Sequence, residues 1–463
     1  QSSLNFYLRD PEGLAFDSVT GDLYVASYSD HRIIKFTSAG VGSRFAGGGS
    51  SNTDGATRIT TKCNNPARLV LDEANNKLFS SCYGNTGGSD GAVKYFRTDV
   101  DQAYTLIRYQ GNTSTEGTTN SYAGTARMPR AYAIAKHPGK DIIYATDLQH
   151  CRMHAISYGD TESYYNGAEV LTANTMQRLT LNTGCGNTVD REYTNTGGRL
   201  RPYGIAPYVS GGVLKGIFMS LYNNHSVVYL NTTATDQTFG GRTITSGYYH
   251  RIFGTGSSDY ARGTPTYTSS YVSLPRGVRI KGDTLYIADY NNFKVGTLDI
   301  STTNGAAGDL VGNLRTYTYD SESSKHANER QYYYPSALAF DATNNSVLIM
   351  DWGNRRIRSM SLANGSVTTV AGRGNGNSNT NPEDPLLAYM QTPRDLTVGD
   401  NGNMIMYSDS NTGAGTNRNC LVRVLNRSGS DQTYFNQLIP NNRVSTVGGN
   451  YVNGCNTWSA GYE

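Results

Sequence analysis

Three stretches of the sequence hold residue types that could do chemistry. The stretch "GGSDG" at residues 87–91 satisfies the G-x-S-x-G pattern of a serine nucleophile, but it lacks the preceding buried strand and the following helix that this motif requires. His150 and His154 would lie about 13 Å apart along a strand, too far to share a metal ion. The stretch from Gly372 resembles a phosphate-binding loop only in glycine content. We therefore predict no catalytic residue, no metal site and no cofactor.

A different set of residues recurs by position. Aromatic residues follow an apolar run and precede a polar turn, at Tyr28, Tyr83, Tyr222, Tyr290 and Trp352. Arginines stand directly after a proline, at Arg130, Arg276 and Arg394. Aromatic rings and guanidinium groups suit stacking on sugars or peptides and hydrogen bonding to carboxylates or sulfates. The same aromatics could instead cap gaps between repeats, and the sequence leaves both interpretations open.

The elements that would position these residues are short strands. An apolar run of four to six residues begins at each of seven prolines, spaced 55 to 73 residues apart: Pro11, Pro66, Pro129, Pro202, Pro275, Pro335 and Pro393. Second and third runs follow each proline, and a fourth is readable in most repeats, all bounded by Gly, Asp, Asn or Ser. The chain thus reads as seven units of four strands.

A four-stranded meander has two faces to bury, so copies of it stack around an axis. We predict one all-β domain over residues 1–463, a β-propeller of four-stranded antiparallel blades. Seven blades are expected, with six as the alternative. Because strands alternate in direction, the aromatic turns and the arginines should lie at the same end of the blades.

The repeats also resemble a known family. The stretches "PEGLAFDSVTGDLYVASYSDHRIIKF", "PSALAFDATNNSVLIMDWGNRRIRSM" and "DTLYIADYNNFKV" look like NHL repeats, in which a proline-led strand and an LYVAD-like strand precede Asn-His-Arg-Ile. The resemblance runs from about Pro11 to Gly449 and is best in blades one, five and six. Blades two, three, four and seven depart from the Asn-His-Arg-Ile pattern. The resemblance implies a propeller, often one of six blades.

Six cysteines suggest a disulfide framework. Their positions at matching ends of blades predict the pairs Cys63–Cys82, Cys151–Cys185 and Cys420–Cys455. Such pairs indicate an oxidising compartment, so we predict a secreted protein. The alternative is six free buried thiols.

Six Asn-x-Ser/Thr sequons are candidates for glycosylation, at Asn112, Asn224, Asn231, Asn344, Asn364 and Asn426. Four of them, Asn112, Asn344, Asn364 and Asn426, fall in expected turns, where a glycan could be accommodated. Asn224 and Asn231 flank a strand.

Composition narrows the function. The formal charge is only +3 over 463 residues, which gives no sign of the basic surface that nucleic-acid-binding proteins carry. No apolar run reaches the ~20 residues needed to span a bilayer. We predict a non-catalytic extracellular propeller that binds protein or glycan, self-associates, or belongs to a larger extracellular assembly. The alternative is a secreted propeller lyase or hydrolase with an axial metal.

The ends of the repeat carry one more prediction. The stretch before Pro11 lacks a full strand, while the seventh repeat has its own fourth strand. The first and last blades should therefore meet through side chains, without a strand from one terminus completing the other's sheet.

Overall fold

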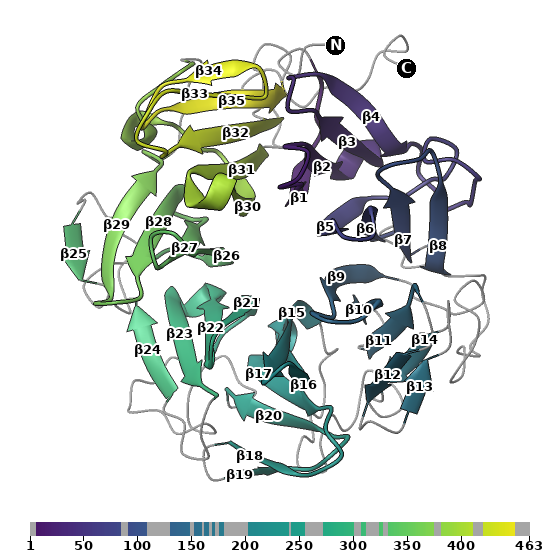
Figure 1. Cartoon of the computed structure of the whole chain (residues 1–463). Coiled ribbons are helices and arrows are strands. Elements are labelled where there is room, and N and C mark those ends of the chain that lie inside the picture. Colours follow the sequence, from purple (N-terminus) through teal and green to yellow (C-terminus); the bar gives the residue numbers. More distant parts are fainter. Residues whose placement is uncertain are drawn as a thin grey trace. The chain divides into compact units, whose positions relative to one another are not determined.

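The computed structural model describes residues 6–84, 91–108, 130–148, 152–159, 162–165, 169–171, 176–179, 202–239, 242–254, 272–300, 307–311, 324–326, 332–374, 381–410 and 420–449. The protein is an all-β, seven-bladed β-propeller with four-stranded antiparallel blades (Figure 1). Within the described ranges the helices are short 3-10 turns, and none could span a lipid bilayer.

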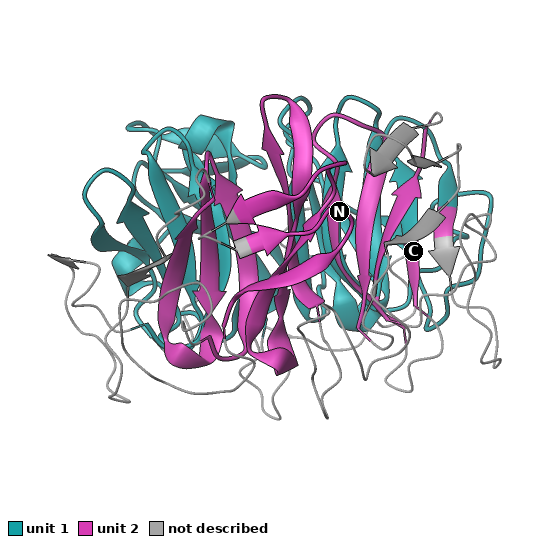
Figure 2. Ribbon diagram, turned by 90° about the horizontal axis from the view of Figure 1, so that it is seen from below, with its two compact units in different colours: residues 1–82, 94–104, 318–463 teal, residues 83–93, 105–317 magenta. Residues whose placement is uncertain are grey.

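The chain divides into two compact units, coloured separately in Figure 2. Unit 1 comprises Gln1–Cys82, Lys94–Tyr104 and Thr318–Glu463, and it holds blades one, six and seven with most of blade two. Unit 2 comprises Tyr83–Val93 and Thr105–Tyr317, and it holds blades three, four and five.

The blades of unit 1 follow the predicted strand order. Blade one is β1 (Pro11–Phe16), β2 (Leu23–Ser27), β3 (Arg32–Phe36) and β4 (Gly42–Gly47); blade two is β5 (Pro66–Asp72), β6 (Lys77–Cys82), β7 (Ala92–Arg97) and β8 (Ala103–Arg108). Blade six is β26 (Pro335–Asp341), β27 (Ser346–Asp351), β28 (Arg356–Ser361) and β29 (Ser366–Ala371); blade seven is β30 (Pro393–Gly399), β31 (Met404–Ser410), β32 (Cys420–Asn426) and β35 (Val444–Gly449).

Unit 2 repeats the same order. Blade three is β9 (Ala131–Lys136), β10 (Ile142–Asp147), β11 (Arg152–Ser157) and β14 (Met176–Leu179); blade four is β15 (Pro202–Ser210), β16 (Val213–Leu221), β17 (Ser226–Asn231) and β20 (Tyr249–Phe253). Blade five is β21 (Pro275–Lys281), β22 (Thr284–Asp289), β23 (Lys294–Asp299) and β24 (Ala307–Val311).

Several strands were not predicted. Hairpins are inserted before the fourth strand in three blades: β12–β13 (Glu162–Tyr165, Glu169–Leu171), β18–β19 (Gln237–Phe239, Arg242–Ile244) and β33–β34 (Gln432–Tyr434, Gln437–Ile439). A short strand, β25 (Ser324–His326), adds a fifth member to blade six beside β29. Short polar segments of three or four residues carry too weak an alternation to be recognised as strands.

The second strands of blades one, three, six and seven are buried along their whole length. These strands, β2, β10, β27 and β31, are buried because a neighbouring blade covers each face of the sheet. The apolar cores accordingly lie between blades. One core joins Val25, Ile34 and Phe36 of blade one to Met406 and Val422 of blade seven.

Neighbouring innermost strands approach each other closely just after the proline. The register shifts near the start of the innermost strand in all seven blades, which marks a bulge. A Cβ on Gly13 would lie 2.7 Å from the carbonyl oxygen of Ala67, and one on Gly204 would lie 2.4 Å from that of Arg276. Only glycine permits this backbone approach.

A hydroxyl from the second strand bridges the bulge to the next blade. Ser220 accepts a hydrogen bond from the Gly204 amide and donates one to the Arg276 carbonyl. Ser408 likewise accepts from the Asp395 amide and donates to the Glu12 carbonyl at 3.0 Å. The serine side chain thus satisfies backbone groups that the bulge frees.

Among the described residues, no strand from one terminus completes the sheet of the other terminal blade, as predicted for blades one and seven. Each sheet is built from its own consecutive strands, and Phe6 and Leu8 contribute only side chains to the core that both blades share. The Ser410 hydroxyl also donates to the Asp10 carboxylate.

Residues of the repeated sequence motif hold the entry loops of blades two, five, six and seven. The aspartate that ends a second strand accepts a hydrogen bond from an entry-loop amide: Asp289 from Ser273, Asp351 from Tyr333 and Asp409 from Thr392. The motif histidine holds the entry loop of the following blade. His31 Nδ1 accepts a hydrogen bond from the Asn65 backbone amide, and His225 Nδ1 accepts one from the Leu274 backbone amide. These motif residues are therefore structural.

Of the predicted disulfides, Cys63–Cys82 is present. Cys420 is also disulfide-bonded, and no described cysteine is free. Cys151, Cys185 and Cys455 lie outside the described residues, so the pairs that involve them remain predictions.

Burial of neutral histidine predicts a loss of stability in mild acid. Burial, together with the charges of Lys140 and Lys136, lowers the pKa of His137 to about 4, and its Nδ1 accepts a hydrogen bond from the Gly139 amide. The unfolded chain then binds the extra proton first, so the free energy of unfolding should fall as the pH drops from about 6.5 toward 4. After allowance for solvent screening, we expect His137 to account for about 1 kcal/mol of that fall.

Denaturant titrations at pH 7 and pH 5 test this. His137→Asn keeps an acceptor for the Gly139 amide but does not titrate, so its difference in unfolding free energy between the two pH values should be smaller than that of the wild type. An unchanged difference would mean that His137 has no part in it.

Candidate binding site on the aromatic turns

The predicted aromatic residues occupy the same turn of their blades. Tyr28, Tyr222 and Tyr290 each begin a 3-10 turn that directly follows the second strand: η2 (Tyr28–Asp30), η4 (Tyr222–Asn224) and η5 (Tyr290–Asn292). Tyr83 directly follows β6, and Trp352 directly follows β27. In blades one, four and five, the residue after the 3-10 turn has the left-handed backbone conformation. This residue redirects the chain into the third strand.

In unit 2 the aromatic rings form a continuous series. Tyr83 and Tyr132 have ring centroids 6.0 Å apart, Tyr132 and Tyr203 4.5 Å, Tyr203 and Tyr222 5.3 Å, and Tyr222 and Tyr290 6.4 Å. Tyr132 and Tyr290 are buried, whereas Tyr83, Tyr203 and Tyr222 are half-buried. The rings meet edge-on or tilted, and three of the five keep part of their surface exposed to solvent.

Sequence reasoning missed two members of this series. Tyr203 directly follows Pro202, where other blades carry arginine, and Tyr132 stands two residues after Arg130. Both belong to the start of an innermost strand, and β9, β15 and β21 pack side by side. An aromatic residue at the position otherwise held by arginine was the signal that could have revealed Tyr203.

Arg276 lies among three of these rings. Its guanidinium carbon is 3.6 Å from the ring centroid of Tyr290, 5.2 Å from that of Tyr203 and 5.5 Å from that of Tyr222. Burial opposes its charge, but Tyr203 and Tyr290 outweigh this, and its pKa is raised. The buried Nε has no hydrogen-bond partner. The ring faces therefore hold a fixed cation.

Arg130 repeats this arrangement on a smaller scale. Its guanidinium carbon lies 5.6 Å from the ring centroid of Tyr83. Unit 2 thus brings together five predicted residues, Tyr83, Tyr222, Tyr290, Arg130 and Arg276, with Tyr132 and Tyr203 in addition. We call these seven residues the tyrosine–arginine cluster.

The predicted residues of unit 1 are arranged differently. Arg394 lies within ion-pair distance of Asp10 and Glu12, at 3.7 and 3.9 Å. Trp352 meets Tyr334 edge-on at 5.9 Å between centroids. Tyr28 is half-buried on η2. Arg394 therefore has carboxylates as neighbours, whereas Arg276 has aromatic rings. The difference arises because the strand entry next to Arg394, in blade one, carries Asp10 and Glu12.

Three of the predicted glycosylation sites are corrected by burial. Asn224, Asn231 and Asn426 are fully buried. The amide nitrogens of Asn231 and Asn426 each donate to two backbone carbonyls, one in the inserted hairpin and one in the turn before it, so they cannot carry a glycan in the folded protein. Asn426 looked like a turn residue because the hairpin that covers it was not foreseen. Asn344 and Asn364 are exposed, and Asn112 lies outside the described residues.

The stretches first inspected for chemistry give no assembled site. His154 is buried within β11, and His150 and Ser89 lie outside the described residues. In the described part of the chain, no three His, Cys, Asp or Glu side chains converge on a point where a metal ion could sit.

Comparisons with known proteins support the fold. No protein family and no curated protein matches the sequence. Among solved structures, a streptogramin B lyase matches with a TM-score of 0.50 and 12% identity over 88% of this chain and 92% of that chain. An auxiliary nutrient binding protein from Bacteroides thetaiotaomicron matches with a TM-score of 0.45 and 14% identity over 84% and 83%. The structural neighbours are β-propellers, and identities this low show the fold alone.

Proposed function

We propose that this protein is a non-catalytic extracellular β-propeller, similar to NHL-repeat proteins, that binds a protein or glycan through the tyrosine–arginine cluster. It would serve as a recognition or structural module, alone, by self-association or within a larger extracellular assembly. The observation that carries the proposal is Arg276, a cation fixed against the Tyr290 ring with its Nε unpartnered.

The chemistry of the cluster favours recognition. A guanidinium whose faces are covered by rings still presents its donor edge, which suits a carboxylate, sulfate or carbonyl oxygen of a ligand. Half-buried tyrosines add flat apolar surface and hydroxyl groups at little entropic cost. Aromatic residues and arginine are the types most enriched at binding hot spots.

The extracellular part of the proposal rests on the cysteines. The Cys63–Cys82 disulfide and the absence of free thiols among the described cysteines are typical of proteins that fold in oxidising compartments. The low net charge and the many turn-forming residues are compatible with an extracellular protein.

Arg276 variants test the proposal. Because Arg276 also joins blade four to blade five through three rings, Arg276→Ala should lower the free energy of unfolding by about 1–3 kcal/mol. Arg276→Lys keeps the charge against the rings but loses the planar donor fork, so it should remain close to native stability. Arg279→Ala, an exposed arginine on the same strand, is the control.

Binding is measured by capture of partners from the native source on each immobilised variant. The proposal expects at least a tenfold loss of the captured partner with Arg276→Lys and none with Arg279→Ala. Equal capture by all variants, with a stability loss confined to Arg276→Ala, would show that the cluster only joins blades. Elemental analysis of the purified protein covers the alternative, since a stoichiometric axial metal would favour a lyase or hydrolase.

A further inference from the structure

A mixed-charge cluster lies at the entries of three neighbouring innermost strands of unit 1. Glu12 is the second residue of β1, Arg394 and Asp395 are the second and third of β30, and Arg68 is the third of β5. Asp10 precedes β1. The strands β26, β30, β1 and β5 pack side by side in this order (Figure 1). We call these five charged residues the strand-entry cluster.

The ion pairs of this cluster are loose. Arg68–Asp395 measures 3.6 Å, Arg394–Asp10 3.7 Å and Arg394–Glu12 3.9 Å, all beyond hydrogen-bond distance. Elsewhere in unit 1 ion pairs are close, such as Arg427–Asp341 at 2.8 Å and Arg358–Asp351 at 3.2 Å. A gap of this size between charged groups is what a bridging water or ligand hydroxyl fills.

The cluster also retains unused hydrogen-bonding capacity. The buried Nε of Arg394 has no partner, and Ser336 Oγ, at the corresponding position of β26, has none either. Glu12 is held within ion-pair distance of Arg394 without accepting a hydrogen bond from it. Burial raises the pKa of Glu12, and Arg394 and Arg68 counteract this. Buried polar atoms without partners are costly, so their presence at one place points to a missing polar partner.

An aromatic pair belongs to blade six, whose innermost strand β26 packs against β30. Tyr334 immediately precedes β26, and its ring meets that of Trp352 edge-on. Both side chains are half-buried, so each offers part of a ring face. An apolar ring beside paired donors and acceptors is the combination that binds the face and the hydroxyls of a pyranose.

We propose that the strand-entry cluster, with Ser336 and the Trp352–Tyr334 pair, is a binding site for a neutral saccharide. Ligand hydroxyls would donate to the carboxylates of Glu12 and Asp10 while accepting from the Arg394 guanidinium. The ring of Trp352 would contact the sugar face.

The charge balance favours a neutral ligand over an acidic one. The cluster contains two guanidinium groups and three carboxylates. An anionic ligand would therefore be repelled by the nearby carboxylates of Asp10, Glu12 and Asp395. A neutral polyol, by contrast, satisfies donors and acceptors in equal measure. The inference goes beyond the proposed function, because it assigns a second site and a ligand class to the part of the predicted surface that belongs to unit 1.

Titration with defined oligosaccharides tests this. The full chain is titrated calorimetrically with neutral hexasaccharides of glucose, mannose, galactose and N-acetylglucosamine, and with a hexamer of galacturonic acid. We expect one of the neutral hexamers to bind and the acidic hexamer to bind at least tenfold more weakly.

Variants place the site. Ser336→Ala removes a hydroxyl that has no partner, so affinity should fall about three- to tenfold with no change in melting temperature. Glu12→Ala and Trp352→Ala should each lower affinity at least tenfold. Arg427→Ala, which breaks an ion pair at the opposite end of β26, should leave affinity unchanged.

Three outcomes would overturn the inference: no neutral hexamer binds, the acidic hexamer binds best, or the Ser336 and Glu12 variants bind like the wild type. If oligosaccharides fail while a native partner is captured in an Arg276-dependent manner, the proposed function stands and this inference fails. If a neutral hexamer binds while Arg276→Lys has no effect on capture, this inference stands and the proposed function of the tyrosine–arginine cluster fails.

Discussion

Asp351→Ala is expected to lower the free energy of unfolding by about 3–5 kcal/mol, because it removes a carboxylate that pairs with the buried Arg358 guanidinium. Both side chains are fully buried, with Arg358 Nε 3.2 Å from Asp351 Oδ2. The same carboxylate accepts hydrogen bonds from the Asn354 amide group and the Tyr333 backbone amide. Its loss therefore also releases the entry loop beside Trp352.

Thermal and urea unfolding monitored by tryptophan fluorescence measure this effect. Asp99→Ala, which breaks the exposed pair with Arg97, should leave the melting temperature unchanged. The double variant Asp351→Asn/Arg358→Met should recover part of the loss, since it removes the charge as well as its partner. A melting temperature for Asp351→Ala equal to that of Asp99→Ala would show that the buried pair is dispensable.

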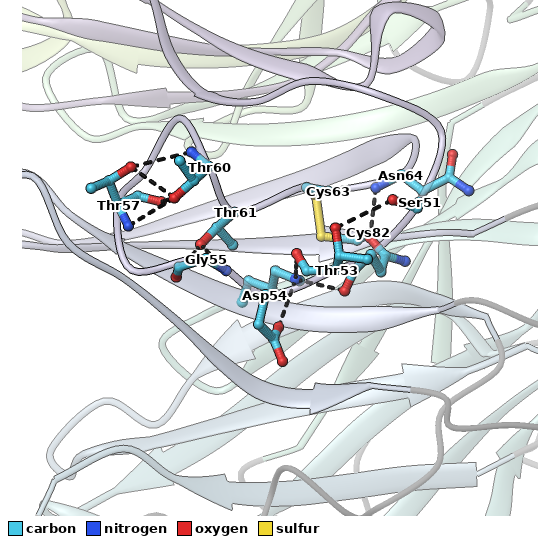
Figure 3. A network of polar contacts seen from close by, with 12 residues as sticks. Ser51, Thr53, Asp54, Gly55, Thr57, Thr60, Thr61, Cys63, Asn64 and Cys82 are labelled. Atoms are coloured by element: carbon cyan, nitrogen blue, oxygen red, sulfur yellow. Dashed lines mark hydrogen bonds and ion pairs between the residues drawn. A yellow bond between two sulfur atoms is a disulfide. The ribbon is translucent and has the colours of Figure 1, made fainter.

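Removal of the Cys63–Cys82 disulfide is expected to cost about 2–4 kcal/mol, because the bond closes a loop with a sequence separation of 19. The cysteines join the end of β6 to the connection between blades one and two. Figure 3 shows the polar contacts of that connection, in which Asn52 Oδ1 accepts from the Asn64 amide and Thr61 Oγ1 bonds to Gly55. These contacts need the loop to be held in place.

The variant Cys63→Ala/Cys82→Ala measures the cost without introducing a buried polar atom. Its unfolding free energy is compared with that of the wild type in the presence and absence of a reductant. Reductant should lower the stability of the wild type toward that of the variant, and leave the variant nearly unchanged. Limited proteolysis should cut the variant faster within residues 50–62, and equal cutting in both proteins would contradict a role for the disulfide in ordering this loop.

Much of the fold could be predicted because its signals are local. A proline followed by a bounded apolar run indicates where each innermost strand begins, and the described innermost strands begin within two residues of the predicted prolines. The inserted hairpins escaped prediction because their strands are three or four residues long and mostly polar. Asn426 was misjudged for the same reason, since the hairpin buries it.

The candidate site was only partly foreseen. The recurrence of Tyr222 and Tyr290 on one turn was visible in the sequence, and so was Arg276 after its proline. The partners of the arginines were not, because they come from neighbouring blades: rings from blade four surround Arg276, while Glu12 of blade one faces Arg394.

The sequence by itself determined the strand order and the seven-fold repetition, because these depend on interactions between residues close in the chain. Only the tertiary structure decided which arginine meets aromatic rings and which meets carboxylates. Stacking of blades brings together strand entries that are 55 to 73 residues apart in sequence, such as Tyr203 with Arg276, and no local pattern encodes that pairing. The difference between a stacked cation and a loose mixed-charge cluster therefore arises from the neighbour that each blade acquires on folding.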